Sequence, residues 1–308
     1  MSNTSLAGRT AIVTGAGGGL GRAEALALAA HGANVVVNDY SEAGAAVVQE
    51  IKEAGGNALE VRGDVGEWAL GDQLVAAAVD SYGSLDIVVN NAGVLRDTMI
   101  FNLTESDWDD VIRVHLKGHA SLSRAAGVHW RAASKAAGGP VYGRLVNTTS
   151  EAFLFGSAGQ PNYAAAKAGI VSLTLSASQG LSRYGVTSNA IAPRARTDMT
   201  AHVFADDPDG ARELDILAPE RVAEFVSYLA SPASAEVNGQ VFVVYGDMVA
   251  LMDSPKVEQK FVATDGTFTV AELDEQVSAY FSGRSPHQNY AAYSVASLDT
   301  TGVENVAN

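Results

Sequence analysis

Three polar residues near the middle of the chain could perform acid–base chemistry on an alcohol or a ketone. Tyr163 and Lys167 stand four residues apart in the segment NYAAAKAG, at the start of a predicted helix that continues to Ala177, so their side chains share one helix face. Ser150 lies thirteen residues before Tyr163 and follows a predicted strand. We expect Ser150 to hydrogen-bond the substrate oxygen and Tyr163 to exchange its proton.

A tyrosine acts as a base at neutral pH only if its phenolate is stabilised, because its ordinary pKa is about 10. The ammonium of Lys167, together with the positive charge of an oxidised nicotinamide, is expected to lower the pKa of Tyr163. Lys167 could also bind the ribose hydroxyls of such a cofactor. The simpler alternative is an aromatic residue beside a solvated cation, a pairing that occurs often by chance. A serine hydrolase is disfavoured, because no G-x-S-x-G turn surrounds Ser150.

The segment TAIVTGAGGGLGRAEALALAAHG, at the start of the chain, reads as a strand, a glycine turn and an amphipathic helix. Gly15 would permit the tight turn, Gly19 would let the backbone approach a pyrophosphate, and Gly21 would allow close packing of helix and strand. The helix N-terminus would offer free N–H groups and a partial positive charge to the phosphates. We expect dinucleotide contacts at Gly15, Gly19, Leu20 and Gly21, although glycine clusters also form ordinary turns.

Acidic residues after the next two strands suggest which dinucleotide binds. Asp39 follows the strand VVVN at the place where a carboxylate accepts hydrogen bonds from the adenosine ribose. A 2′-phosphate there would be repelled, and neither Ala16 nor Tyr40 offers a compensating cation, so NAD is expected rather than NADP. The alternative is a solvated carboxylate at a strand end. Asp64 and Val65 follow the third strand, where Asp64 could hold the adenine amino group.

Short β-branched runs alternate with Ala-rich helical segments and must position these residues. Runs such as IVVN and VVVN are apolar without a period of two, which is typical of parallel strands covered on both faces. We therefore predict an α/β fold with a single Rossmann-type, doubly wound parallel sheet of about seven strands. The predicted strands are Thr10–Thr14, Asn34–Asn38, Ala58–Arg62, Leu85–Asn90, Arg144–Thr148, Val186–Ile191 and Gln240–Tyr245.

The alternation stops after Tyr245. We predict a nucleotide-binding domain over residues 1–250 and a C-terminal extension over 251–308 that packs on the same fold or on a neighbouring subunit. Within the extension we expect a hairpin around Lys260–Thr269 and a short helix near Glu272–Phe281. The Gly-rich segment 127–142 is interpreted as a helix end followed by a loop.

Composition narrows the class of protein. The chain has 308 residues, a net charge of −15 and no dense basic run, so nucleic acid is not expected as a partner. It has no cysteine, which fits a reducing compartment, and the N-terminal sequence has no apolar run of signal-peptide length. We expect a cytoplasmic protein without a membrane span or a metal site.

Taken together, these motifs resemble the short-chain dehydrogenase/reductase family over roughly residues 6–250. TGAGGGLG resembles the family's glycine loop, NNAG at Asn90–Gly93 its strand-four motif, and Ser150, Tyr163 and Lys167 its active-site residues. The resemblance implies cofactor contacts at Asn91, Ala92, Gly93 and Pro193, besides Tyr163 and Lys167.

Two positions depart from the usual family pattern: His115 stands where most members carry a catalytic Asn, and Pro193 is followed by Arg194 where many members have Gly. The segments WDDVIRVHLKG and GQPNYAAAK are similar to the (3R)-hydroxyacyl-CoA dehydrogenase region of peroxisomal multifunctional enzymes and to bacterial hydroxysteroid dehydrogenases, in which a His is expected here. His115 would be a catalytic residue that relays protons from Lys167 through water, or else a hydrogen-bonded core histidine.

The resemblance implies an NAD-dependent oxidoreductase of lipid or sterol degradation, acting on a small molecule or acyl-CoA and assembled as a homodimer or homotetramer. Dehydrogenases of small terpenoid or sugar alcohols, and a non-catalytic NAD-binding protein, stay open as alternatives. Residues 194–219 correspond to a substrate loop. Four cations, Arg194, Arg196, Arg131 and Lys135, could bind CoA phosphates or could be solvated surface charges.

Overall fold

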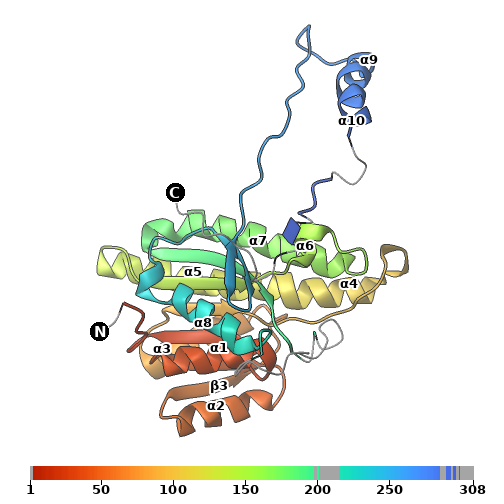
Figure 1. Ribbon diagram of the computed structural model, residues 1–308. Helices are drawn as coiled ribbons and strands as arrows, with labels where there is room; N and C mark the ends of the chain where they lie inside the picture. Colours follow the sequence, from red (N-terminus) through yellow and green to blue (C-terminus); the bar gives the residue numbers. More distant parts are fainter. Residues whose placement is uncertain are drawn as a thin grey trace.

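A computed structural model describes residues 3–197, 200, 215–284, 289–292, 294–295 and 298. One eight-stranded sheet runs through the molecule in the order β3-β2-β1-β4-β5-β6-β7-β8 (Figure 1). The first seven strands are parallel, and β8 pairs with β7 in the antiparallel sense. The strands are β1 Thr10–Thr14, β2 Asn34–Asp39, β3 Asn57–Arg62, β4 Ile87–Asn90, β5 Gly143–Thr148, β6 Val186–Arg194, β7 Val241–Tyr245 and β8 Met248–Leu251.

Helices cover both faces of the sheet, because the strands are apolar on both sides. One core joins Val13 and Val37 of the sheet to α1 (Gly19–Ala30), α2 (Ala43–Glu53) and α8 (Pro219–Ala230). The other face packs Ile12 and Val88 against α3 (Leu70–Tyr82) and α5 (Gly118–Ala137), with α7 (Pro161–Leu181) beside α5. The predicted doubly wound α/β fold is confirmed.

Shorter elements complete the body around these layers. A 3-10 turn η1 (Ile100–Asn102) precedes α4 (Glu105–Val111), which continues through a π-helical turn η2 (Ile112–Lys117) into α5. The hydroxyl of Thr104 caps α4 by accepting from the N–H of Asp107 at 3.1 Å. The remaining short elements are α6 (Ala152–Phe155), η3 (Ser182–Tyr184) and η4 (Pro232–Ser234).

The strand order reverses between β1 and β4, whose neighbours lead to opposite ends of the sheet. Ligands of doubly wound proteins bind at the carboxyl ends of the strands near such a reversal. The glycine turn after β1, the segment after β4 and Ser150 after β5 all lie at this edge. Among the described residues, no helix combines the length and apolar character needed to cross a bilayer.

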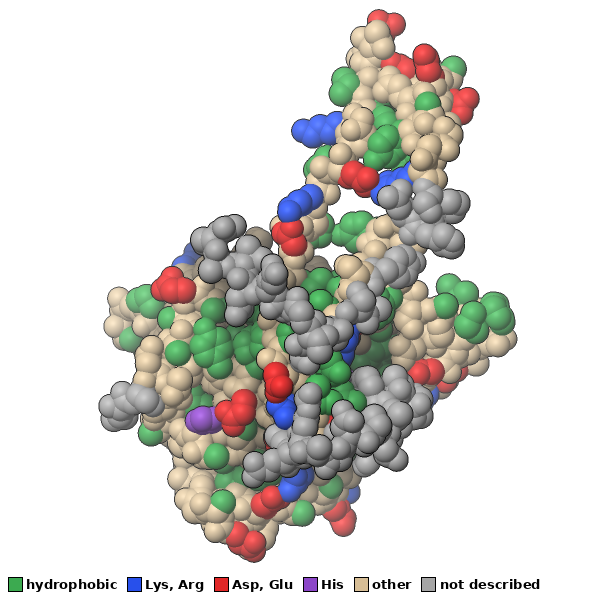
Figure 2. Space-filling model, in the orientation of Figure 1, with side chains coloured by type: hydrophobic (Ala, Val, Ile, Leu, Met, Phe, Trp, Pro, Cys, Tyr) green, Lys and Arg blue, Asp and Glu red, His purple; other side chains and the backbone are tan. Residues whose placement is uncertain are grey.

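The C-terminal extension leaves the body and returns to it. After β8 the chain runs out as an arm, carries α9 (Val270–Leu273), η5 (Asp274–Ser278) and α10 (Ala279–Ser282) at its far end, and comes back near α6 (Figure 1). Val295 then packs with Ala192 and Val243 of the sheet. Hydrophobic side chains stand exposed on the arm (Figure 2), including Val257, Val270 and Phe281.

The predicted hairpin over Lys260–Thr269 is wrong. These residues form a turn with Gly266 at φ +79° and no paired strands, and the N–H and hydroxyl of Thr264 donate to the carboxylate of Glu272 at 2.7 and 2.8 Å. The turn is thus held by a side chain of the following helical segment, which agrees with the helix predicted near Glu272–Phe281.

Candidate active site

Ser150, Tyr163 and Lys167 converge at the carboxyl edge of the sheet. Tyr163 and Lys167 lie in the first two turns of α7, and Nζ of Lys167 is 5.4 Å from the centroid of the Tyr163 ring. The side chain of Ser150, two residues beyond β5, hydrogen-bonds that of Tyr163. The hydroxyl of Ser150 also accepts from the N–H of Ala152 at 3.2 Å, which fixes its orientation.

Burial governs the protonation of this group. Lys167 is 2% exposed, its ammonium donates to the carbonyl of Thr148 at 2.6 Å, and burial lowers its pKa to about 7. Burial raises the pKa of Tyr163, the charge of Asp97 adds to this, and the hydrogen bond from Ser150 opposes it. In the protein alone, burial thus raises the pKa of the phenol and lowers that of the lysine, and Lys167 is not a cause of the Tyr163 shift.

A buried asparagine that the sequence analysis did not single out holds the start of α7. The amide of Asn162 donates to the carbonyls of Arg96 and Asp107, both at 3.1 Å, and its oxygen accepts from the N–H of Tyr163 at 2.8 Å. One side chain thereby ties the loop after β4, helix α4 and Tyr163 together. Its position next to Tyr163 was the available signal, but the partners lie more than fifty residues away in sequence.

His115 lies beside Tyr163, with the two ring centroids 5.2 Å apart in an edge-on arrangement. Its Nε2 is 2.8 Å from the carbonyl oxygen and 3.0 Å from the amide nitrogen of Val94. Burial, followed by the nearby charge of Lys167, holds the pKa of His115 well below its usual value, so the ring is neutral. A Cβ on Gly93 would lie 2.4 Å from the His115 ring, so only glycine permits this contact.

The glycine turn is fixed by the ends of β1 and β4. Gly15 has φ +63°, and a Cβ there would approach Cα of Ala92 to 2.7 Å. A Cβ on Gly21 would lie 2.4 Å from the carbonyl oxygen of Gly15. The side chain of Asn91 donates to the carbonyls of Thr14 and Gly15 at 3.0 and 3.3 Å. The predicted residues Gly15, Gly21, Asn91 and Ala92 therefore form one compact unit.

The residues around this turn fit a dinucleotide. Helix α1 has no side-chain cap at its N-terminal Gly18, and a Cβ on Gly18 would meet open space. The first-turn N–H groups, including those of Gly19 and Leu20, are therefore available to an anion. The carboxylate of Asp39, 8% exposed, accepts from the N–H of Gly17 at 3.0 Å and from Ser41. These bonds hold Asp39 at the rim of the turn, where a ribose would lie.

The other predicted cofactor residues lie at the same edge. Arg113 of η2 donates to the carboxylate of Asp64 at 2.6 Å. Burial raises the pKa of Asp64, but the bonds from Arg113 and from the N–H of Gly66 outweigh burial, so the pKa lies below its usual value. Val65 lies against Gly118 at the start of α5. Pro193 is the penultimate residue of β6. The sequence analysis missed Thr197, whose methyl group lies against Gly19.

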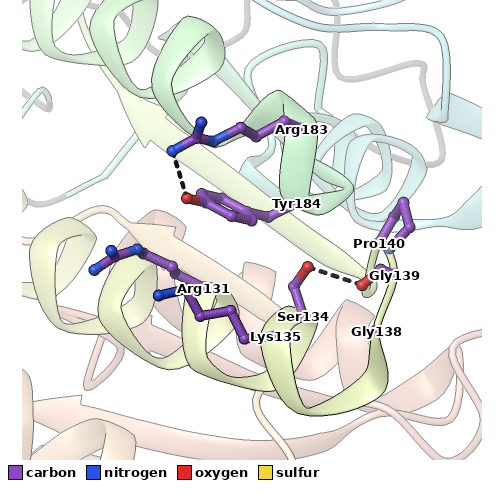
Figure 3. A pocket seen from close by; sticks show the side chains of 8 residues that line it. All are labelled: Arg131, Ser134, Lys135, Gly138, Gly139, Pro140, Arg183 and Tyr184. Carbon is purple, nitrogen blue, oxygen red and sulfur yellow. Dashed lines mark hydrogen bonds between the residues drawn. The ribbon is translucent and has the colours of Figure 1, made fainter.

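Of the four cations predicted as candidates for CoA phosphates, two are paired with carboxylates and two lie at the opposite edge of the sheet from Ser150. Arg194 pairs with Glu151, and Arg196 donates to Asp215 at 2.9 Å, so both have carboxylate partners. The central part of the predicted substrate loop lies outside the described residues. Arg131 and Lys135 line a hollow of about 480 Å³ with Arg183 and Tyr184 (Figure 3). These residues precede β5 and β6, so the hollow lies at the amino edge of the sheet, opposite Ser150.

Comparison with known proteins agrees with this geometry. The sequence profile of a family described as short chain dehydrogenase matches residues 9–208. The chain is 53% identical over 299 residues to the hydroxyacyl-CoA dehydrogenase ChsB1 of Mycobacterium tuberculosis, with 94% of each chain covered. It is 40% identical over 247 residues to the peroxisomal multifunctional enzyme type 2 of Mus musculus, covering 77% of this chain but 31% of that protein.

A solved structure of a short chain dehydrogenase is also similar to this chain. A short chain dehydrogenase from Mycobacterium avium superposes with a TM-score of 0.82 at 45% identity, covering 91% of this chain and 96% of that one. The family expected from the sequence motifs is thus confirmed: the chain belongs to the short-chain dehydrogenase family of oxidoreductases.

Proposed function

We propose that the protein is an NAD-dependent dehydrogenase that interconverts a secondary alcohol and a ketone, with a 3-hydroxyacyl-CoA as substrate and a hydroxysteroid as the next candidate. The observation that carries this proposal is the convergence of Ser150 and Lys167 on Tyr163 beside the glycine turn. Bound nicotinamide would supply the hydride acceptor or donor.

In this proposal each side chain has one task at the substrate oxygen. Ser150 hydrogen-bonds that oxygen and orients it toward Tyr163, whose hydroxyl accepts or donates the proton. Because the pKa of Tyr163 is raised by burial, the phenol stays protonated at neutral pH in the protein alone. A protonated phenol is suited to donate to a ketone, and alcohol oxidation depends on the added positive charge that an oxidised nicotinamide brings.

The acyl-CoA class is supported by the relative named hydroxyacyl-CoA dehydrogenase, which this chain matches along almost its whole length. NAD is supported by Asp39, which is held at the rim of the glycine turn by Gly17 and Ser41. A 2′-phosphate at that place would meet a carboxylate, and the adjacent Tyr40 is 78% exposed and brings no positive charge.

The test is absorbance at the nicotinamide band with the purified full chain. A 3-hydroxyacyl-CoA and a hydroxysteroid are each supplied with NAD and with NADP, and Tyr163→Phe is measured beside the unmodified protein. Turnover of the acyl-CoA with NAD, lost in Tyr163→Phe, supports the proposal. Binding of NAD without turnover across acyl-CoA, steroid, terpenoid and sugar alcohols would instead favour a non-catalytic NAD-binding protein.

We further propose that the protein is a homodimer or homotetramer in which the arm of the extension packs on a neighbouring subunit. Apolar side chains on the arm support this, since Val257 is 74% exposed, Val270 84% and Phe281 52%. Sedimentation of the unmodified chain and of a Val270→Glu, Phe281→Glu double variant tests it. Identical assemblies for both, or a monomer in both, would contradict the arm as a contact.

A further inference from the structure

Arg131 and Lys135 of α5 and Arg183 of η3 form a cluster of cations that the proposed chemistry does not use. Together with Tyr184 they line the hollow of about 480 Å³ at the amino edge of the sheet (Figure 3). The three cationic side chains are exposed, so a ligand can reach them from solvent. None of the described residues that line the hollow is acidic. A volume of this size is within the usual range for a small-molecule site.

The charge of this cluster contrasts with that of the rest of the chain. The chain has a net charge of −15, and most of its described arginines pair with a carboxylate. Examples are the pairs of Arg22 with Glu50 and of Arg124 with Asp72. Within the described part of the chain, no carboxylate pairs with any of the three cations of the hollow. The hollow therefore collects positive charge that the protein does not neutralise by an ion pair.

The needs of helix α5 explain only one of these cations. Lys135 lies in the last turn, where the helix dipole favours a cation, but Arg131 lies one turn earlier. Side chains four residues apart on a helix are neighbours, so these two like charges repel each other. The carbonyl of Ser134 already accepts from the N–H of Gly139 at 3.2 Å, which caps the end of the helix. The stability of α5 therefore gives no reason to place Arg131 beside Lys135.

Hydrogen bonds between backbone segments hold the walls of the hollow in place. The N–H of Val141 donates to the carbonyl of Tyr184 at 2.8 Å, which joins the entry of β5 to the entry of β6. Gly185 has φ +86°, and a Cβ there would overlap the carbonyl oxygen of Val141, so only glycine permits this approach. On the side of α5, the hydroxyl of Ser134 donates to the carbonyl of Gly139 at 2.8 Å. The hollow is therefore formed by the fold itself.

The side chains of the hollow offer hydrogen-bond donors to a ligand. Nη2 of Arg183 donates to the hydroxyl oxygen of Tyr184 at 2.7 Å, which leaves the hydroxyl hydrogen of Tyr184 available. Burial raises the pKa of the Tyr184 phenol, but the hydrogen bonds and charges of Arg183 and Arg131 outweigh it, so the pKa lies below its usual value. Guanidinium groups bind phosphate through paired hydrogen bonds, and a lysine ammonium adds a point charge. A phosphate monoester, with about two negative charges and three acceptor oxygens, matches this set of donors.

We propose that this hollow is a binding site for a phosphate group, either the free ion or a phosphate monoester, held by Arg131, Lys135 and Arg183. A carboxylate carries one charge and two oxygens, so it would satisfy fewer of these donors. The site lies at the edge of the sheet opposite Ser150, so a phosphate bound there competes with neither the proposed substrate nor the dinucleotide. The inference is therefore independent of the proposed function.

The test is isothermal titration calorimetry of the full chain at low ionic strength, with inorganic phosphate, glycerol 3-phosphate and acetate as separate probes. An excess of NAD is present, because the glycine turn could also bind a phosphate. Arg131→Gln removes one charge from the hollow. Arg124→Gln is the matched control, because Arg124 lies on the same helix and is already paired with Asp72. Circular dichroism establishes that each variant is folded.

We expect Arg131→Gln to weaken the binding of the phosphate probes by about tenfold or more, the scale of one hydrogen bond between charged groups, and Arg124→Gln to weaken it by less than about twofold. Arg183→Gln should behave like Arg131→Gln. Binding of glycerol 3-phosphate would identify a monoester as the ligand, and binding of inorganic phosphate alone would identify the free ion.

Three results would overturn the proposed phosphate site. The first is the absence of saturable binding of both phosphate probes, and the second is binding of acetate as tightly as of phosphate. The third is an equal loss of affinity in Arg131→Gln and Arg124→Gln. Sedimentation of the same proteins adds a further check, because a changed assembly in Arg131→Gln without phosphate binding by the unmodified protein would make the hollow a contact between subunits instead.

Discussion

The guanidinium of Arg194 donates to both carboxylate oxygens of Glu151, the residue next to Ser150, at 2.7 and 2.8 Å. The two side chains are 13% and 12% exposed, so the pair is largely removed from solvent. Other donors of Arg194 reach the carbonyls of Val295 and Leu298. The returning segment of the C-terminal extension is thereby bonded to a residue adjacent to the candidate catalytic serine.

Arg194→Ala should lower the free energy of unfolding by about 3 kcal/mol, because it leaves the Glu151 carboxylate largely buried without its cation. Urea denaturation measures this. Arg62→Ala is the matched control, since its pair with Glu42 is 54% and 87% exposed, and it should cost less than about 1 kcal/mol. Equal losses in the two variants would show that the buried Arg194–Glu151 pair stabilises the fold no more than an exposed pair does.

Tyr163→Phe should reduce kcat by roughly a hundredfold or more, because the proposed proton donor and acceptor is lost while the ring is kept. Its affinity for NAD, followed by the quenching of protein fluorescence, should change little. Tyr82→Phe, a partly buried tyrosine on α3, serves as the control and should retain full turnover. Retention of turnover by Tyr163→Phe would remove Tyr163 from the chemistry.

Glu24 gives the fold a dependence on pH. It is fully buried in α1, neither carboxylate oxygen has a hydrogen-bond partner among the described residues, and burial raises its pKa from 4.5 to about 8. The folded protein keeps this proton to a higher pH than the unfolded chain does. The contribution of Glu24 to stability is therefore fully present below pH 4.5 and is lost as the pH rises through about 8.

Urea denaturation of the unmodified protein and of Glu24→Gln across this range tests the effect. At the acidic end of this pH range the two proteins should have similar stability. At the alkaline end the unmodified protein should be less stable than Glu24→Gln by a few kcal/mol, because each unit of pKa difference is about 1.4 kcal/mol. Glu105→Gln, on the exposed start of α4, should follow the unmodified protein. Parallel curves for all three would mean that Glu24 does not titrate in this range.

Asp39→Asn should weaken the preference for NAD over NADP by roughly tenfold or more, because it removes the negative charge that a 2′-phosphate would meet. Its neutral amide can still bond Gly17 or Ser41, so folding should be retained. The kcat/KM ratio for the two cofactors measures the preference. Glu42→Gln, three residues further on and exposed, is the control. An unchanged ratio in Asp39→Asn would mean that a residue other than Asp39 selects between NAD and NADP.

The sheet and the glycine turn could be predicted because their signals are local. β1 has the predicted bounds, whereas β6 runs three residues beyond the predicted Ile191, since Ala192, Pro193 and Arg194 pair with β7. The eighth strand was missed although Gly246 and Asp247 form a two-residue turn between apolar runs.

Side-chain contacts between distant segments were beyond prediction. In a buried ladder, the amide of Asn90 on β4 donates to the side-chain oxygen of Asn147 on β5 at 2.9 Å, and Asn147 donates to Thr174 on α7 at 2.9 Å. Nothing local pairs these residues, which come from three separate elements. How deeply the phenol of Tyr163 is buried, which raises its pKa in the protein alone, likewise depends on such distant contacts.

The arm of the extension begins at β8 and ends where the N–H of Ala292 donates to the carbonyl of Leu154 at 2.8 Å. Because both ends of the arm are attached to the body, a reporter protein inserted at its tip is expected to leave the sheet undisturbed. A stop codon placed before Ala292 is a different change. It would remove the residues that pack on Leu154 and the carbonyl groups to which Arg194 donates, so the shortened protein is expected to be less stable.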